Sequence, residues 1–293
     1  MTLDLRIAAA GRPAAAPAGA MRDLSRTQTT SARARRARGR VRPRRLLRIA
    51  VPLFGLALWE ITSATGFLSP RTLDSPATVV SAFSQLISTG QLQAALGSSL
   101  QRSAIGLAGG FTVGTLFGLI TGLSRLGEEL LDSSMQMFRM VPFLAIVPLL
   151  ITWFGIGELA KDLLIAFACV FPAYINTYAA VRSIDPRLLE AARVFGLRGW
   201  RLVRTVVLPN SMPGVLVGLR FSMGVSILAL IAAEQINANS GLGYLVSVAE
   251  EAFRNDIIVA LILVYALLGL LIDLFVRVLE RVLLPWRASM VGR

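Results

Sequence analysis

The chain has 293 residues, of which 55% are hydrophobic, and its mean hydropathy is +0.65. These values exceed those of a soluble domain of this length and indicate a polytopic membrane protein. The chain has no histidine and a single cysteine, which excludes imidazole metal sites, histidine-based triads, disulfides within the chain and cysteine metal clusters, so no metal site is predicted.

The net charge of +13 is concentrated at the N-terminus, where twelve arginines and only two acidic residues precede residue 46. We interpret residues 1–45 as a disordered, arginine-rich cytoplasmic tail, because its alanine, proline and arginine residues offer no clear apolar face to bury. Such a tail sets membrane topology and contacts anionic lipid head groups. Its charge would also suit nucleic acid, but we favour the lipid reading and predict no nucleic-acid partner.

Six apolar segments meet or nearly meet the length of about 20 residues that a helix needs to cross the hydrocarbon core. They lie at about residues 46–67, 105–123, 132–157, 163–181, 212–235 and 257–279. The sequence therefore predicts an all-α polytopic membrane protein in which residues 46–293 form one domain of six transmembrane helices.

Basic residues indicate how these spans are oriented. They gather in the tail, between the fourth and fifth spans, and after the sixth span. An even number of spans places all three regions on one side, as the positive-inside rule requires of the cytoplasm. The opposite loops carry few bases, among them Lys161, Arg254 and, in the long loop after the first span, Arg71 and Arg102. Both termini are therefore predicted to be cytoplasmic.

The segment 69–99 is expected on the outer side of the membrane. Apolar residues recur in it at helical spacing, at Val79, Val80, Phe83, Leu86 and Ile87. This pattern predicts a short amphipathic helix on the outer face.

The second span carries five glycines, each four residues from the next: Gly106, Gly110, Gly114, Gly118 and Gly122. Small residues at this spacing let helices approach closely in lipid. Each four-residue step drifts by about 40° around a helix. The five glycines are therefore not expected to share one face, and this span is predicted to contact more than one neighbour.

A polar island, DPRLLEAARVFGLRGWRLVRTVVLP, separates the fourth and fifth spans. Asp185 suits a helix N-cap, and Gly196 suits a helix end. An apolar stripe is expected along the helix between them, formed by Leu188, Leu189, Ala192 and Phe195. The island predicts a short, rigid cytoplasmic helix over about residues 185–197. This helix could be an element that a partner protein grips, or an interfacial helix that merely joins two spans. Spacing alone supports the two interpretations equally.

The island also carries a motif. The letters EAA at Glu190, Ala191 and Ala192 are followed, after three intervening residues, by Gly196. After nine more intervening residues come Val206 and the pair Leu208–Pro209. This pattern resembles the EAA loop of ATP-binding-cassette importer permeases, with Val206 in place of the more usual isoleucine. Residues 139–167, 176–196 and 239–246 resemble the nitrate, sulfonate and taurine branch of that family, and the aliphatic sulfonate permeases most of all.

The resemblance implies a type I importer permease fold in a bacterial inner membrane. It implies that two copies form a homodimer, that two ATPase subunits grip the cytoplasmic helices, and that an extracytoplasmic solute-binding protein delivers substrate. Because the chain has no GxxxxGK[ST] phosphate loop, ATP and Mg²⁺ are expected on the separate ATPase, with no enzyme activity and no cofactor in this chain. The residues expected to couple to the ATPase are Asp185, Glu190, Ala191, Ala192, Gly196, Leu208 and Pro209.

Two arginines within predicted spans are candidates for the translocation path, because a charge inside a bilayer usually faces a cavity or a partner. Arg139 and Arg220 lie at similar predicted depth on the third and fifth spans. They could attract an anion such as a sulfonate. We favour the alternative that they form an ion pair with Asp273, which could also pair with Arg277 four residues later.

Four further polar residues are pathway candidates. Glu234 and Gln235, at the outer end of the fifth span, could form a gate or contact the binding protein, although a negative Glu234 would repel an anion. Asn176 and Tyr178 interrupt the apolar fourth span. We favour interhelical hydrogen bonds for both of them over contact with substrate.

These observations predict a permease subunit of an ATP-driven importer that moves small organic anions, aliphatic sulfonates first, into the cytoplasm. Taurine, nitrate or another small anion is the alternative within this class. An ion-coupled secondary transporter is the rival class, and it is disfavoured because the spans hold few carboxylates and no histidine. A membrane-embedded enzyme is disfavoured because the carboxylates Glu60, Glu234 and Asp273 are scattered.

Overall fold

The computed structural model describes residues 43–65 and 73–285, so the predicted tail up to residue 42 lies outside the described residues. The chain divides into two units between Leu53 and Phe54, and the packing described below lies within the second. Every regular element in the described part is helical, which confirms the all-α prediction. The elements are α1 (Pro43–Ala64), α2 (Pro76–Ser88), α3 (Gln91–Leu123), α4 (Arg125–Gly127), a π-helical turn (Glu128–Asp132), α5 (Ser133–Phe138), a 3₁₀ turn (Phe143–Ile146), α6 (Val147–Phe154), α7 (Glu158–Arg182), α8 (Pro186–Val194), α9 (Gly199–Leu202), a second π-helical turn (Val203–Val207), α10 (Leu208–Asn237), α11 (Leu242–Glu251) and α12 (Asn255–Leu283).

Four helices in the described part are long and apolar enough to cross a membrane. They are α3, α7, α12 and a continuous helix, Gly199–Ile236, that runs through α9, the second π-helical turn and α10. A bent pair, Arg125–Phe138 and Phe143–Phe154, raises the number to five if it counts as one span. The first predicted span, residues 46–67, overlaps α1 (Pro43–Ala64), which is not among these candidate spans. The second predicted span begins fourteen residues too late, because α3 starts at Gln91.

The third predicted span is not a straight helix. Its two halves, α5 and α6, meet at an angle of 87°. The break falls at Pro142, whose backbone is extended with φ −60° and ψ 122°. A proline disfavours helical backbone at the residue before it and has no N–H to continue the helical hydrogen bonds. Pro142 therefore marks a sharp bend where the hydropathy pattern alone predicted continuity.

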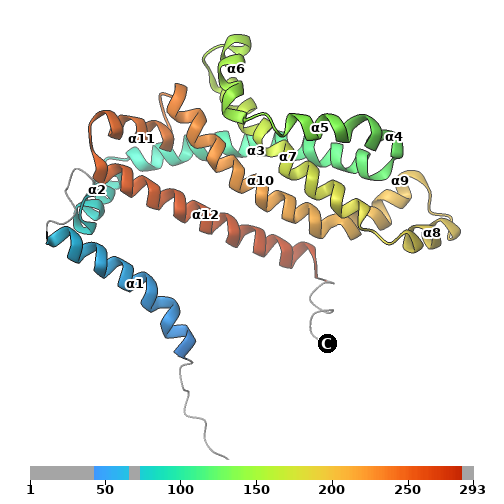
Figure 1. The fold of residues 1–293 in the computed structure, drawn as a ribbon, viewed down its shortest axis with the longest axis horizontal. Helices are drawn as coiled ribbons and strands as arrows, with labels where there is room; N and C mark the ends of the chain where they lie inside the picture. The colour runs from blue at the N-terminus through green and yellow to red at the C-terminus, as the bar shows by residue number, and fades with distance from the viewer. Residues whose placement is uncertain (1–42, 66–72, 286–293) are drawn as a thin grey trace, which may run out of the picture. The chain divides into compact units, whose positions relative to one another are not determined.

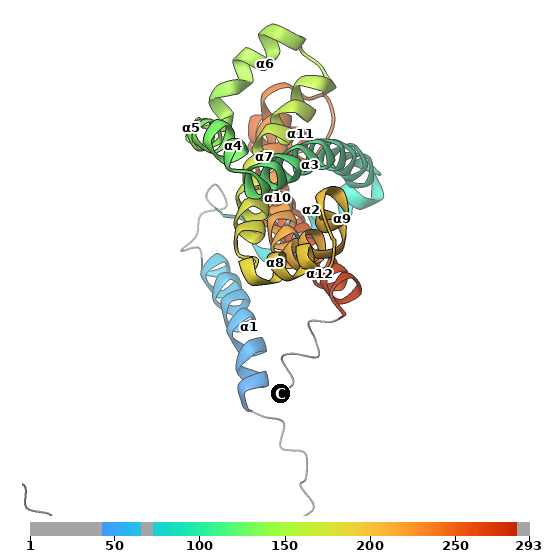
Figure 2. The same cartoon turned by 90° about the vertical axis from the view of Figure 1, so that its right-hand side faces the viewer.

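The glycine stripe of α3 lies against α7 at all five of its positions. The two helices are neighbours in the fold, and Figures 1 and 2 show them in two views. A Cβ atom built at Gly106 would lie 2.6 Å from the Ile165 Cβ, and one at Gly118 would lie 2.8 Å from the Thr177 Cβ. Gly122 meets Val181 of α7 in the same way. The expectation that the five glycines would not share one face was wrong, because all five meet α7. The prediction that this span contacts more than one neighbour is confirmed, since α3 also packs against α10 and α2.

The helix α7 is the centre of the packed domain, with α3 on one side of it and α10 on another (Figure 1). Its residues Ile165, Cys169 and Ala173 have no exposed surface. Small residues also bring α10 close, since a Cβ atom at Gly218 would lie 3.1 Å from the Asn176 Cβ. Close approach of small side chains thus holds the three helices together.

The predicted amphipathic helix of the outer segment corresponds to α2. Its residues Val79, Ala82 and Leu86 are buried, whereas Val80 and Ile87 are exposed. The buried face packs against α12 and the start of α3. Within residues 54–293, α2 and α11 lie at one end of the helices and α8 lies at the other (Figure 1). The predicted outer segment and the polar island are thus at opposite ends.

Candidate functional site

The polar island forms a helix with defined ends. The Asp185 carboxylate accepts a hydrogen bond from the Arg187 backbone N–H at 2.9 Å, and Pro186 fills the first helical position. At the other end Gly196 has φ +83°, and the Leu197 N–H donates to the Ala192 carbonyl at 3.0 Å. A left-handed glycine with these bonds satisfies the last carbonyls of a helix. Both ends of α8 are therefore fixed locally.

Only one side of α8 is covered by the rest of the domain. Ala192 is buried, and Leu189 packs beside the cluster of Val181, Ile184 and Val207. The other two residues of the predicted stripe, Leu188 and Phe195, are 43% and 85% exposed, so only part of the stripe faces the domain.

Of the predicted coupling residues, Ala192 is buried, and the structure separates the others into two groups. Asp185, Glu190, Ala191 and Gly196 are exposed on or beside α8. Leu208 and Pro209 are half-buried in the first turn of α10. Around the first group, α8 and its flanks expose large apolar side chains at Leu188, Val194, Phe195 and Trp200. The exposed side of α8 thus combines an acidic residue with apolar surface, a composition that suits a protein partner.

Of the two pathway arginines, Arg220 of α10 pairs with α12. Its Nη2 donates to Glu280 Oε1 at 3.0 Å, and its Nε lies 3.8 Å from Asp273 Oδ1. Asp273 also accepts a hydrogen bond from Arg277 at 2.6 Å. The favoured pairing with Asp273 is thus present for Arg220, and Glu280 is a partner that the sequence reasoning missed. Arg139 is exposed at the end of α5 and forms no ion pair with the described residues.

The two polar residues of the fourth span behave differently. The Tyr178 hydroxyl donates to Glu128 Oε1 at 2.8 Å, so it forms the interhelical bond that we favoured. Arg182 donates to the same carboxylate at 2.8 Å. Asn176 instead donates to the Pro172 carbonyl of its own helix at 2.8 Å. The interhelical bond expected for Asn176 is therefore not formed among the described residues.

Glu234 is the centre of a buried polar network that the sequence did not predict. Its side chain has no exposed surface and accepts hydrogen bonds from Arg102 Nη1 at 2.7 Å and from the Gly243 N–H at 2.8 Å. Ser99 Oγ lies 2.8 and 2.9 Å from its two carboxylate oxygens, and Ser99 also accepts from the Leu242 N–H. Because Glu234 is buried, it cannot contact a binding protein in this conformation, whereas the neighbouring Gln235 is exposed.

Arg102 was expected in an outer loop, but it lies within α3 and is 6% exposed. Its partner on α7 is Glu158, the first residue of that helix. Arg102 Nε donates to Glu158 Oε2, and Arg102 Nη2 donates to Glu158 Oε1 at 3.0 Å. Its Nη1 and Nη2 also donate to the Ser240 carbonyl and hydroxyl at 2.7 and 2.9 Å. Arg102 therefore joins α3, α7, α10 and the loop before α11.

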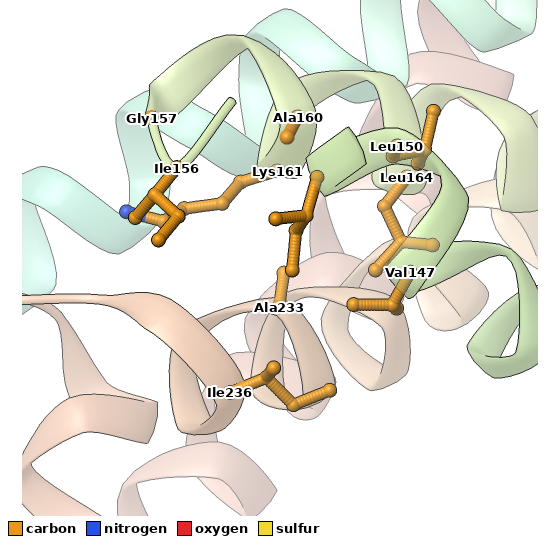
Figure 3. Close-up of a pocket in the computed structure, with 10 residues that line it drawn as sticks. Val147, Leu150, Ile156, Gly157, Ala160, Lys161, Leu164, Ala233 and Ile236 are labelled. Carbon is orange, nitrogen blue, oxygen red and sulfur yellow. The ribbon is translucent and has the colours of Figure 1, made fainter. Parts of the chain in front are cut away.

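Lys161, the chain's sole lysine, extends this network. Its Nζ donates to Glu158 Oε1 at 2.9 Å, and the residue is 7% exposed. Its aliphatic stem lines a cavity of about 20 Å³ with Val147, Leu150, Ala160, Leu164 and Ala233. Figure 3 shows the Lys161 nitrogen on the Ile156 side of that cavity, away from Leu164 and Val147. So small an apolar cavity has room for about one water molecule and cannot hold a substrate.

Comparisons with known proteins agree on one family. The family model for the inner membrane component of binding-protein-dependent transport systems matches residues 114–284. A chain of Escherichia coli (strain K12) named as the aliphatic sulfonates transport permease protein SsuC is 48% identical over 83% of this chain and 94% of its own length. A chain of Bacillus subtilis (strain 168) with the same name is 38% identical over 90% and 96%. The taurine transport system permease protein TauC of E. coli is 34% identical over 80% and 87%.

Solved structures show the same fold. The inward-facing methionine ABC transporter MetNI matches with a TM-score of 0.59 and 19% identity, over 64% of this chain and 94% of that one. An amino acid ABC transporter matches with a TM-score of 0.55 and 20% identity, over 68% and 96%. The predicted resemblance to ABC importer permeases is thus confirmed. The chain belongs to the family of binding-protein-dependent transport system inner membrane components and is a multi-pass permease of the sulfonate and taurine branch.

Proposed function

We propose that this chain carries aliphatic sulfonates across the inner membrane into the cytoplasm as the permease subunit of an ATP-driven importer. The observation that carries the proposal is the 48% identity to a permease named for aliphatic sulfonates, over 94% of that protein's length. Taurine is the second candidate, because a taurine permease is 34% identical. Taurine and the aliphatic sulfonates share a sulfonate group.

The proposal includes the rest of the transporter. Two copies of the chain line the path, two ATPase subunits bind ATP and Mg²⁺ in the cytoplasm, and a solute-binding protein delivers substrate on the other side. The basic regions support cytoplasmic termini, since positive residues stay on the cytoplasmic side. The fixed ends and exposed apolar side chains of α8 support its role as the helix that the ATPase grips.

Transport measurements test the substrate. Proteoliposomes that contain this chain, its ATPase and its binding protein are expected to take up ethanesulfonate when ATP is supplied inside, where the ATPase acts. Taurine, nitrate and riboflavin serve as competitors in the same assay, riboflavin because a riboflavin permease is 30% identical to this chain. Uptake of riboflavin or of a cation, without uptake of any sulfonate, would overturn the proposal.

Replacement of Glu190 by alanine tests the docking helix. The side chain is exposed and forms no ion pair with the described residues, so its loss is expected to change the free energy of unfolding by less than about 0.5 kcal/mol. The variant is nevertheless expected to retain less than about a tenth of the ATPase on co-purification, as a loss of about 1.4 kcal/mol of binding implies. Glu251→Ala, at an exposed glutamate of α11, is the matched control and should retain the ATPase fully. Equal retention by both variants contradicts docking at α8.

A further inference from the structure

The network around Arg102 has a buried part and an accessible part. Glu234 has a side chain with no exposed surface, and Arg102 and Lys161 have side chains that are 7% and 8% exposed. Glu158, in contrast, is 60% exposed although it binds both cations. Two buried positive charges therefore share one buried carboxylate and one carboxylate that reaches solvent.

Glu158 occupies a position that another oxyanion could take. Its two oxygens accept from Nε and Nη2 of Arg102, which form the fork that recognises carboxylate, phosphate and sulfonate groups alike. Lys161 donates one hydrogen bond to Glu158, and it has two further N–H groups for an acceptor. A sulfonate carries the same single negative charge as Glu158, so an exchange of the two leaves the charge of the network unchanged.

The surroundings leave room for that exchange. A cavity of about 370 Å³ lies beside the pair and is lined by Arg102, Glu158, Asp162, Ser98, Gln101 and Ser240. Apart from Ile105, the residues that line it are polar, which suits a charged group with hydrogen-bond acceptors. Glu158 follows Gly155, whose φ is +77°, and Gly157, whose backbone is extended, so the turn before α7 contains two residues without side chains to hold it.

The start of α7 adds further donors. Gly157 precedes the helix and provides no side-chain cap for the first backbone N–H groups. Uncapped N–H groups and the helix dipole favour a negative group at this end. Asp162, one turn further along α7, opposes an anion, and it restricts binding to a ligand that makes good hydrogen bonds with Arg102 and Lys161.

From these contacts we propose that Arg102, Lys161 and the first turn of α7 form a binding site for the sulfonate group of the substrate, and that Glu158 fills this site when no substrate is present. The proposal rests on the proposed function, because it assigns a binding site to that same substrate. Substrate that enters displaces Glu158 from Arg102, while Glu234 keeps the other side of the guanidinium in place.

Direct binding tests the site. The probe is ethanesulfonate, added to the detergent-solubilised complex of permease and ATPase without the binding protein. Glu158→Gln keeps the shape of the side chain but removes the competing charge, so it is expected to bind ethanesulfonate at least about tenfold more tightly than the wild type. Lys161→Met removes one donor and is expected to bind at least about tenfold more weakly. Glu251→Gln, at the exposed glutamate of α11, should match the wild type.

Three results would overturn the site. Glu158→Gln could bind ethanesulfonate no more tightly than the wild type, or it could show no measurable binding. Chloride, which cannot form the bidentate contacts, could also displace ethanesulfonate as well as another sulfonate does. A thermal unfolding curve for each variant separates a binding effect from misfolding. If wild-type proteoliposomes import ethanesulfonate but Glu158→Gln binds it no more tightly than the wild type, the proposed site is wrong and the proposed function is still supported. If they import no sulfonate, the proposed function itself falls.

Discussion

Replacement of Arg102 by alanine is expected to lower the free energy of unfolding by about 3–5 kcal/mol, because it leaves the Glu234 carboxylate buried without its cation. Glu234 would keep only Ser99 and the Gly243 N–H as partners. The loop at Ser240 would lose both of its bonds to the guanidinium. This is the largest effect that a single substitution of a polar residue is expected to have in the described part of the chain.

Cys169 allows this loss to be measured. It is the chain's only cysteine and has no exposed surface, so a thiol-reactive dye labels it only when the protein unfolds. Denaturation of the purified permease in detergent gives the free energy from the labelled fraction. The double variant Arg102→Met, Glu234→Leu removes both charges and is expected to recover most of the lost stability, since apolar residues of similar volume replace buried pairs well. A loss below about 1 kcal/mol for Arg102→Ala contradicts a buried ion pair here.

Replacement of Gly114 by alanine is expected to cause the second large loss in the free energy of unfolding. A Cβ atom there would lie 2.8 Å from the Ala173 Cβ and closer still to the Val170 carbonyl, both on α7. Because backbone atoms cannot turn aside as a flexible side chain does, the helices must separate, at a cost of about 1–3 kcal/mol or more. The same thiol-labelling experiment measures it.

Gly109 provides the control for this substitution. It lies on the same helix, and a Cβ atom there would lie 3.9 Å from the Ala166 Cβ, an ordinary contact. Gly109→Ala is therefore expected to keep or raise stability, by up to about 1 kcal/mol, because alanine favours helix more than glycine does. If the two variants unfold at the same denaturant concentration, close approach of α3 and α7 does not stabilise the domain.

The sequence predicted features that depend on neighbouring residues better than features that depend on distant ones. The start and end of α8 follow from Asp185, Pro186 and Gly196, whose hydrogen bonds span no more than five residues. The glycine spacing of α3 likewise revealed close packing. It did not reveal α7 as the neighbour, because the partner helix begins more than thirty residues after α3 ends.

Arg102 shows why the buried network escaped prediction. A search for apolar runs begins the second span at residue 105, since the arginine before it lowers the hydropathy, and so assigns Arg102 to a loop. Its partners Glu158 and Glu234 lie 56 and 132 residues later in the chain. A charge can lie inside a helix bundle only when its partner is present. No local pattern identifies such a partner, although an arginine and a glutamate at the outer ends of two spans are a signal worth testing as a pair.

The continuous helix from Gly199 to Ile236 has a mechanical consequence. Its regular part, the 30 residues of α10, extends over about 45 Å at the usual rise of about 1.5 Å per residue, and the second π-helical turn joins it to α9. One end follows α8 after a short connection, and the other carries Glu234. A tilt imposed at the first end therefore moves Glu234 as the far arm of a lever, without any relay of side chains. Since Glu158 belongs to α7, the same tilt alters the separation of the two carboxylates that Arg102 bridges.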